Sequence, residues 1–258
     1  MKTFGPTTSY TQEDIWRIFR IMSEFVEGYE TMGAIGPAVS IFGSARTPSS
    51  DPYYVKARKL GRMLGERGFA VITGGGPGIM EAANRGAADV GATSVGLNIT
   101  LPHEQLSNPY ANVQVDFRYF FARLVMFVKY ASAFVCFPGG FGTLHEFFNS
   151  MTLIQTHKAE KFPVILIGRS YWAGMETWIR ETMLDRGYGM IDADDMNLFS
   201  TTDSLVEAVR IIQDSWDESQ RHKAAVPPAE RETGEGTVIG KPSRKYPRKR
   251  NGAGDAGV

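Results

Sequence analysis

A glycine-rich turn followed by a carboxylate is the segment of this chain with the clearest chemical potential. Residues 137–146 read Phe-Pro-Gly-Gly-Phe-Gly-Thr-Leu-His-Glu and contain Gly139, Gly140 and Gly142. Apolar residues recur at helical spacing after this turn, so we expect a helix to begin near Thr143. Glycines let the backbone approach a ligand closely, and a helix N-terminus offers unpaired N–H groups and a positive dipole. These features suit a phosphate group.

The carboxylate of Glu146 has more than one possible role. Thr143 and Glu146 have the spacing of a capping box, which would satisfy the helix-end donors without a ligand. Glu146 could also pair with Arg123, a charge within the strongly apolar segment 117–130, which also carries Arg118 and Lys129. Because a buried arginine is rarely unpaired, the two form either an ion pair between helices or a catalytic pair. Consecutive helical residues diverge, so we treat His145 as peripheral.

Two further small-residue turns follow strands that we expect at 38–42 and 69–73. The carboxyl ends of parallel strands meet at one edge of a sheet, so all three turns should surround one cleft. Each turn alone could be a tight connection, but together they suit a small phosphorylated ligand such as a mononucleotide. The two added turns contribute Gly43, Ser44, Gly74, Gly75 and Gly76.

Several common kinds of site are disfavoured because their motifs are missing. A dinucleotide-binding domain would carry Gly-x-Gly-x-x-Gly after the first strand and an acidic residue after the second, and this chain has neither. It also lacks the phosphate-binding motif of nucleoside triphosphatases and the nucleophile turn of serine hydrolases. The histidines lack metal-ligand spacing. The single cysteine, Cys136, excludes a disulfide framework and should be a core residue. We expect no metal and no cofactor.

Strand and helix patterns alternate along the chain, which predicts an α/β fold: a Rossmann-like, doubly wound parallel sheet with helices on both faces. The expected strands are 38–42, 69–73, 93–99, 113–116, 133–136, 162–168 and 197–200. The expected helices are 12–33, one that begins at Pro52 and ends before Gly68, and 79–90, 117–130, 143–154, 171–184 and 204–216. The helix at 117–130 is apolar on nearly every side, so we expect it to be buried in the domain or in a subunit interface.

Three regions are expected along the chain: an N-terminal extension with a helix (1–36), a nucleotide-binding catalytic domain (37–220) and a disordered basic tail (221–258), which includes the run 241–250. An irregular loop is expected at 101–105. The 28 basic and 28 acidic side chains cancel, so no global field favours nucleic acid or membrane as a partner. No targeting segment or membrane span is evident, and we expect a cytoplasmic protein.

The combined motifs resemble the Lonely Guy (LOG) family, whose members were often labelled lysine decarboxylases. Residues 138–146 match the family signature Pro-Gly-Gly-x-Gly-Thr-x-x-Glu, and residues 74–81 and 120–123 agree with it as well. The resemblance extends from about Ala38 to the closing helix. The N-terminal helix and the loop at 101–105 are similar to those of the larger subgroup of the family.

That resemblance implies a phosphoribohydrolase, which cleaves the N-glycosidic bond of cytokinin riboside 5′-monophosphates and of AMP to give the free base and ribose 5-phosphate. It implies that Arg123 and Glu146 are the catalytic pair. It also implies a homodimer or a larger homo-oligomer. The chain departs from the family at Leu124, where a lysine usually follows the arginine. The phosphate would be held by Gly139, Gly140, Gly142 and Thr143, with Gly43 and Ser44 across the cleft.

The chemistry agrees with the residue types. Breaking a glycosidic bond builds oxocarbenium character on the ribose, which a carboxylate such as Glu146 stabilises. Glu146 could also orient or deprotonate the attacking water, with Arg123 holding the carboxylate ionised. Two alternatives remain: a nucleosidase with broad specificity for nucleoside 5′-monophosphates, and a nucleotide-binding protein without catalysis. Lysine decarboxylation is disfavoured, because no lysine lies at a strand-end turn suited to a Schiff base with pyridoxal phosphate.

Overall fold

The computed structural model describes residues 12–101, 107–185 and 189–225. The basic run at 241–250 and most of the loop expected at 101–105 lie outside these residues. The chain divides into two compact units, Met1–Trp216 and Asp217–Val258. The second unit is described over residues 217–225, which are helical. Among the described residues, no helix is both long and apolar enough to cross a membrane.

The first unit is built on a seven-stranded parallel sheet with the strand order β4-β3-β2-β1-β5-β6-β7. Strand β1 (Ala38–Phe42) lies between β2 (Ala70–Thr73) and β5 (Ala133–Cys136). The chain first adds strands on one side of β1 and then crosses to add β5 on the other, so the switch in strand order lies between β1 and β5. The remaining strands are β3 (Ser94–Ile99), β4 (Val113–Phe117), β6 (Val164–Ile167) and β7 (Ser200–Thr202).

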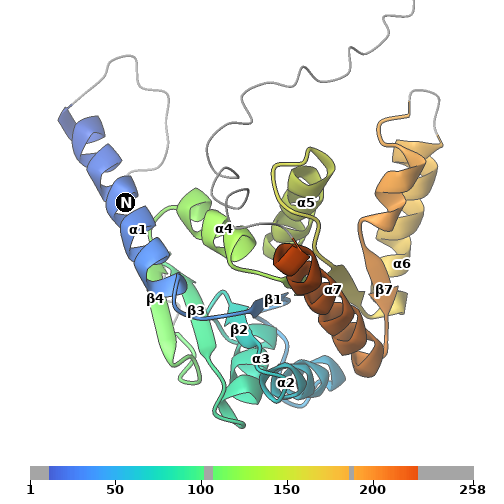
Figure 1. Cartoon of the computed structure of the whole chain (residues 1–258), viewed down its shortest axis with the longest axis horizontal. Coiled ribbons are helices and arrows are strands. Elements are labelled where there is room, and N and C mark those ends of the chain that lie inside the picture. Colours follow the sequence, from blue (N-terminus) through green and yellow to red (C-terminus); the bar gives the residue numbers. More distant parts are fainter. Residues whose placement is uncertain (1–11, 102–106, 186–188, 226–258) are drawn as a thin grey trace, which may run out of the picture. The chain divides into compact units, whose positions relative to one another are not determined.

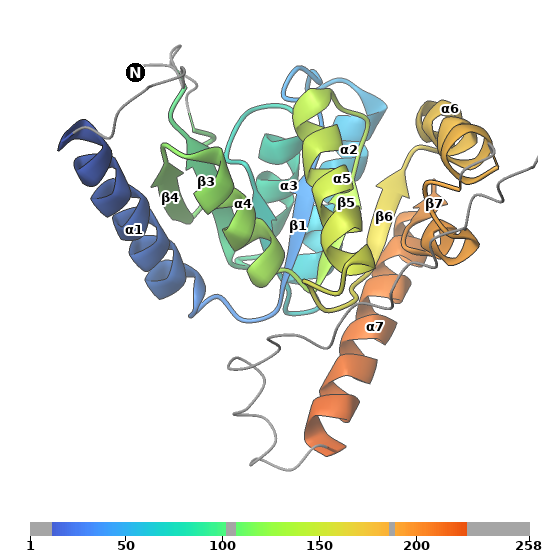
Figure 2. The same cartoon turned by 90° about the horizontal axis from the view of Figure 1, so that it is seen from above.

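Helices cover both faces of this sheet (Figures 1 and 2). One face carries α1 (Gln12–Met32), α4 (Phe120–Lys129), α5 (Phe141–Gln155) and α6 (Arg169–Trp178). The other carries α2 (Pro52–Gly65), α3 (Ile79–Ala88) and the part of α7 (Leu205–Ala225) that lies in the first unit. Each face has its own apolar core. The expected α/β architecture is confirmed.

The central strands are mostly apolar and are buried along their whole length, because helices cover both faces of the sheet. In β1, Val39 and Ile41 enter the core beneath α2 and α3, whereas Ala38 and Phe42 enter the core beneath α4 and α5. Cys136 is fully buried at the end of β5, as expected for a core residue. Burial raises the pKa of its thiol. At the start of α2, Asp51 accepts the N–H of Tyr53 at 2.7 Å and so caps the helix N-terminus.

Several expected element boundaries were wrong. Helix α4 begins at Phe120 and not at 117, because residues 113–117 belong to β4. The last strand is β7 at Ser200–Thr202, because residues 193–197 form the 3₁₀ turn η2 (Ala193–Asn197). Helix α7 continues to Ala225 beyond the expected end at 216. After Trp178, the chain also leaves α6 as a π-helical segment, η1 (Ile179–Leu184).

Candidate active site

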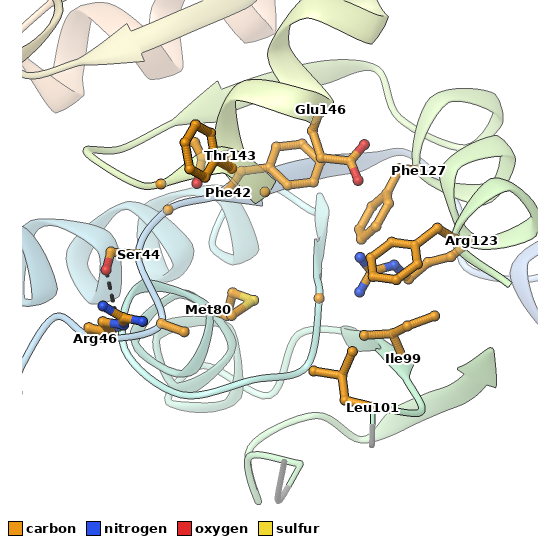
Figure 3. Close-up of a pocket in the computed structure, with 17 residues that line it drawn as sticks. Phe42, Ser44, Arg46, Met80, Ile99, Leu101, Arg123, Phe127, Thr143 and Glu146 are labelled. Atoms are coloured by element: carbon orange, nitrogen blue, oxygen red, sulfur yellow. Dashed lines mark hydrogen bonds between the residues drawn. The ribbon is translucent and has the colours of Figure 1, made fainter. Parts of the chain in front are cut away.

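A cavity of about 650 Å³ opens at the carboxyl ends of β1 and β5, beside the switch in strand order (Figure 3). This is where a doubly wound sheet offers a binding site. Its walls come from the turns after β1, β2 and β5 and from helices α3, α4 and α5. The lining residues are Phe42, Gly43, Ser44, Ala45, Arg46, Gly74, Met80, Ile99, Leu101, Phe120, Arg123, Phe127, Gly140, Phe141, Gly142, Thr143 and Glu146.

Most of the residues proposed from the sequence meet in this cavity. Those that line it are Gly43, Ser44, Gly74, Arg123, Gly140, Gly142, Thr143 and Glu146. Gly139 does not line it but packs against the Thr143 side chain, where a Cβ atom would have no room. Leu124, the departure from the family pattern, does not line it either.

Gly75 and Gly76 also lie outside the cavity lining, and their backbone groups are already bonded. The N–H of Asn108 donates to the carbonyl of Gly75 at 2.8 Å, and the Asn108 side chain donates to the carbonyl of Gly76 at 3.1 Å. Asn108 also donates to the side chain of Asn84, at 2.9 Å. These buried bonds hold the turn after β2 in place. Gly75 and Gly76 therefore support the cavity wall and do not face the cavity.

Helix α5 starts two residues earlier than expected, with Gly140 at its N-cap and no side-chain cap. The capping-box interpretation of Thr143 and Glu146 is therefore wrong, because both residues lie inside the helix. The amides of the first turn, residues 141–143, have no acceptor within the helix. Two hydrogen bonds hold the turn that leads into this helix: Ser44 N–H donates to the Pro138 carbonyl at 3.0 Å, and Tyr171 Oη donates to the Gly139 carbonyl at 2.5 Å.

Glu146 is buried in the wall of the cavity with only 5% of its surface exposed. Its Oε2 atom is fully covered and has no hydrogen-bond partner among the described residues. His145 Nδ1 lies 3.8 Å from Glu146 Oε1, but the His145 side chain is largely exposed and does not line the cavity. Burial raises the pKa of Glu146 to about 7, and the positive charge of Arg123 opposes this rise. A carboxyl group in this state can exchange a proton near neutral pH.

Arg123 enters the cavity from α4, opposite Glu146 (Figure 3). Its guanidinium lies 5.1 Å from the Phe120 ring centre and 5.5 Å from that of Phe127, and its Nη1 donates to the Leu97 carbonyl at 3.5 Å. Its Nε is buried without a partner among the described residues. Burial lowers the pKa of Arg123, and the charge of Glu146 opposes that change.

The pair does not act as a structural salt bridge. Arg123 and Glu146 are both described, and they form neither a hydrogen bond nor a contact ion pair with each other. Each nevertheless alters the pKa of the other. Two charges that share a cavity and leave buried polar atoms without partners are prepared to contact a bound molecule.

Sequence reasoning missed Arg46 and the apolar wall. Arg46 lines the cavity, and its backbone N–H donates to Ser44 Oγ at 3.0 Å. Its side chain is exposed and makes no ion pair with another described residue. The sequence could have indicated Arg46 as a site residue, because it lies two residues after Ser44 in the same strand-end turn. Figure 3 shows Ser44 and Arg46 at one side of the cavity, with Ile99 and Leu101 near Arg123 at the other.

The described residues contain no group of three or more His, Cys, Asp or Glu side chains arranged to hold a metal ion. The polar atoms that face the cavity are a carboxylate, two guanidinium groups, two hydroxyls and backbone amides of glycine-rich turns. This donor set is suited to an anionic, hydroxyl-bearing organic molecule.

Comparison with known proteins identifies the family of this chain and several relatives. The family model described as possible lysine decarboxylase matches residues 80–212. A pyrimidine/purine nucleotide 5′-monophosphate nucleosidase of Escherichia coli (strain K12) is 32% identical over 129 residues, which are 45% of this chain and 28% of that protein. The chain thus spans less than a third of the length of this relative. A cytokinin riboside 5′-monophosphate phosphoribohydrolase of Mycobacterium marinum is 27% identical over 168 residues, which cover 64% of this chain and 88% of that protein.

Solved structures share the fold. An X-ray structure of a Northeast Structural Genomics Consortium target is 28% identical, with a TM-score of 0.51 over 69% of this chain and 99% of that one. The molybdenum cofactor carrier protein of Chlamydomonas reinhardtii, at 20% identity and a TM-score of 0.52, shares the fold alone. The family match covers more than half of this chain, including α4 and the signature turn before α5. The chain therefore belongs to the family described as possible lysine decarboxylase, the Lonely Guy (LOG) family whose signature its sequence carries.

Proposed function

We propose that this protein hydrolyses the N-glycosidic bond of nucleoside 5′-monophosphates, releasing a free base and ribose 5-phosphate. The observation that carries the proposal is the position of Glu146, a buried carboxylate with an unpartnered oxygen, in the same cavity as the N-terminus of α5. A phosphate bound at that helix end would bring the ribose to the carboxylate. The names of the E. coli and M. marinum relatives support this reaction class.

The two sides of the cavity suggest how the substrate is oriented. The amides at Gly140 and Gly142, the hydroxyls of Ser44 and Thr143 and the cation of Arg46 would hold the phosphate. The base would lie towards the apolar wall near Arg123, which is formed by Met80, Ile99, Leu101, Phe120 and Phe127. An aromatic and aliphatic wall suits a flat purine and, beyond it, an apolar substituent such as an isopentenyl group.

The chemistry then depends on Glu146 and Arg123. The bond between C1′ and the base nitrogen breaks, and positive charge develops on the ribose, where the Glu146 carboxylate stabilises it. Glu146 also accepts a proton from the attacking water, whose oxygen bonds to C1′. The departing base takes up the proton that the water gave to Glu146, so that atoms and charge balance and the carboxylate is regenerated. Arg123 favours the ionised form of Glu146 and positions the nucleotide.

Base selectivity separates the cytokinin-specific enzyme from a nucleosidase of broad specificity. The 32% identity to the E. coli nucleosidase is the observation that favours the broad enzyme. Purified protein is incubated with isopentenyladenosine monophosphate, AMP, GMP and CMP, and free base is measured by chromatography. A preference for the isopentenyl substrate supports the cytokinin enzyme, whereas similar rates across bases support the nucleosidase. Binding of AMP without release of any base would contradict hydrolysis and favour a nucleotide-binding protein.

We do not propose that this protein decarboxylates lysine, although the family description names that activity. None of the described residues that line the cavity is a lysine, so it offers no Schiff-base partner for pyridoxal phosphate. We expect no release of carbon dioxide from lysine.

We further propose that the protein is a cytoplasmic homodimer or larger homo-oligomer, with residues 37–220 as its catalytic domain. The predicted burial of α4 is not complete within one chain, because Phe120 and Phe121 are exposed. Helix α1 also exposes Trp16 (61%) and Phe19 (57%). Exposed apolar surface of this kind supports self-association. Light scattering after size-exclusion chromatography measures the oligomeric state, and a monomer at micromolar concentration would contradict the proposal.

A further inference from the structure

One carboxylate of the N-terminal extension is buried although α1 otherwise exposes much of its surface. Glu24 has only 7% of its surface exposed. Its Oε1 accepts the backbone N–H of Arg118 at 2.9 Å, and its Oε2 accepts that of Tyr119 at 3.3 Å. These residues are more than ninety positions apart in sequence. The two bonds join α1 to the segment that leads into α4.

Glu24 supplies a cap that α4 does not have from its own sequence. Tyr119 is the N-cap residue of α4, and its side chain makes no capping hydrogen bond. A carboxylate that binds N–H groups at a helix N-terminus satisfies donors without intrahelical partners and interacts favourably with the helix dipole. Glu24 therefore acts as an N-terminal cap supplied by another helix.

One backbone hydrogen bond links the residue that Glu24 caps to Arg123. The carbonyl of Tyr119 accepts the backbone N–H of Arg123 at 3.3 Å, which closes the first turn of α4. Tyr119 thus donates its N–H to the Glu24 carboxylate and accepts the N–H of Arg123 at its carbonyl. Displacement of this turn would move the point from which the Arg123 side chain enters the cavity.

Helix α1 also holds the far end of α4. Tyr130 Oη donates to the Tyr29 carbonyl at 3.3 Å, and the two tyrosine rings lie 6.4 Å apart edge to face. Between these ends, Gly28 lies directly against the Met126 side chain and leaves no room for a Cβ atom. Since α4 remains attached there, loss of the Glu24 carboxylate should release its first turn more than its last.

We propose that Glu24 is a positioning residue: it fixes the first turn of α4 and thereby the place of the Arg123 guanidinium opposite Glu146. The N-terminal extension then contributes to the active site without touching the substrate. The inference rests on the role proposed above for Arg123, although the cap itself does not depend on catalysis.

The test compares E24Q with the wild type and with E27Q, a control at an exposed residue of the same helix. Glutamine keeps the shape of the side chain but turns an N–H₂ group towards one of the two backbone donors. Three charged or titratable groups lie around Glu146. They are Arg123 on α4, Cys136 on β5 and His145, which precedes Glu146 on α5. Of these, only Arg123 lies on the helix that Glu24 caps.

The first readout is the titration of Glu146, followed by NMR of its side-chain carboxyl carbon and assigned with E146Q. We expect the pKa of Glu146 to rise in E24Q and to remain at the wild-type value in E27Q, because displaced Arg123 opposes the effect of burial less. This readout does not require turnover, so it decides the inference even if the wild type releases no base. An unchanged pKa in folded E24Q would overturn it.

The second readout is kinetic. With AMP as substrate, we expect kcat to fall about ten-fold or more in E24Q, as for other displaced catalytic groups, and KM to change less than about two-fold because the phosphate side is untouched. Hydrogen exchange at the amides of Arg118 and Tyr119 should become faster. Faster exchange together with wild-type kcat would show a cap that does not position Arg123 and would overturn the inference.

Discussion

Replacing Glu146 with glutamine should stabilise the folded protein at alkaline pH. Burial raises the pKa of this carboxyl from an ordinary value of 4.5 to about 7, so the folded state holds its proton more tightly than the unfolded chain does. Between these two pKa values the unfolded chain has lost the proton and the folded protein has not. The wild type therefore loses stability as pH rises through this window and reaches a plateau above it.

The size of the effect follows from the two pKa values. The interval from 4.5 to about 7 corresponds to about 3 kcal/mol in the free energy of unfolding. Part of the interval lies below pH 5, so we expect a loss of about 2 to 3 kcal/mol between about pH 5 and pH 8. Glutamine at position 146 has the same shape and cannot ionise, so E146Q should not show this loss.

Urea denaturation measures the prediction, with fluorescence of the buried Trp172 as one probe. The free energy of unfolding is determined for the wild type and E146Q at several pH values between about 5 and 8. All other titrating groups are common to the two proteins, so the change in their difference with pH isolates Glu146. Parallel curves for the two proteins would refute the reasoning. E27Q, at an exposed glutamate, should follow the wild type.

Three further predictions concern the cavity. The rate of base release should rise with pH through a midpoint near 7, because Glu146 must be ionised; a flat pH–rate profile for kcat would contradict this role. R46Q should raise the KM for AMP about ten-fold and change kcat little, because Arg46 contributes a phosphate contact to substrate binding. Initial rates measure both constants, and an unchanged KM would exclude Arg46 from the phosphate site. G139A should lower the free energy of unfolding by about 1–3 kcal/mol, because the added Cβ would collide with Thr143. The added Cβ of G142A meets no neighbouring atom, so this variant should keep its stability and lose only affinity for AMP. Equal losses of stability for the two variants in urea denaturation would contradict the packing argument.

The fold could be read from the sequence because its strands follow simple rules. The strands on either side of the switch point, at 38–42 and 133–136, are short, mostly apolar runs between turn residues, and each is buried on both faces. Element ends were harder to place. Aromatic residues continue from β4 into α4, so apolar periodicity does not mark the boundary at Phe120. The last strand has no such apolar pattern, since Ser200–Thr202 is polar and short.

The candidate site was partly accessible from the sequence. Strand-end turns converge by topology, so Ser44, Gly74 and Thr143 could be assigned to one cleft before the fold was known. Motif spacing did not distinguish turn residues that face the cleft from those that support it, as the bonded carbonyls of Gly75 and Gly76 demonstrate.

Contacts that depend on tertiary packing were not visible in the sequence. The capping box at Thr143 and Glu146 was consistent with the spacing alone, yet α5 begins earlier, with Gly140 as its N-cap residue. The bond from Tyr119 to Glu24 spans 95 positions, and no local pattern identifies such a partner.

Glu146 is proposed to perform N-glycosidic hydrolysis in a cavity that binds a nucleoside 5′-monophosphate. The most direct measurement is the release of adenine and ribose 5-phosphate from AMP by the wild type and by E146Q, with adenosine as the substrate that lacks the phosphate. We predict equal amounts of the two products from AMP with the wild type, little release from adenosine, and none with folded E146Q. Wild-type rates in E146Q, or no release of base by the wild type, would contradict the claim.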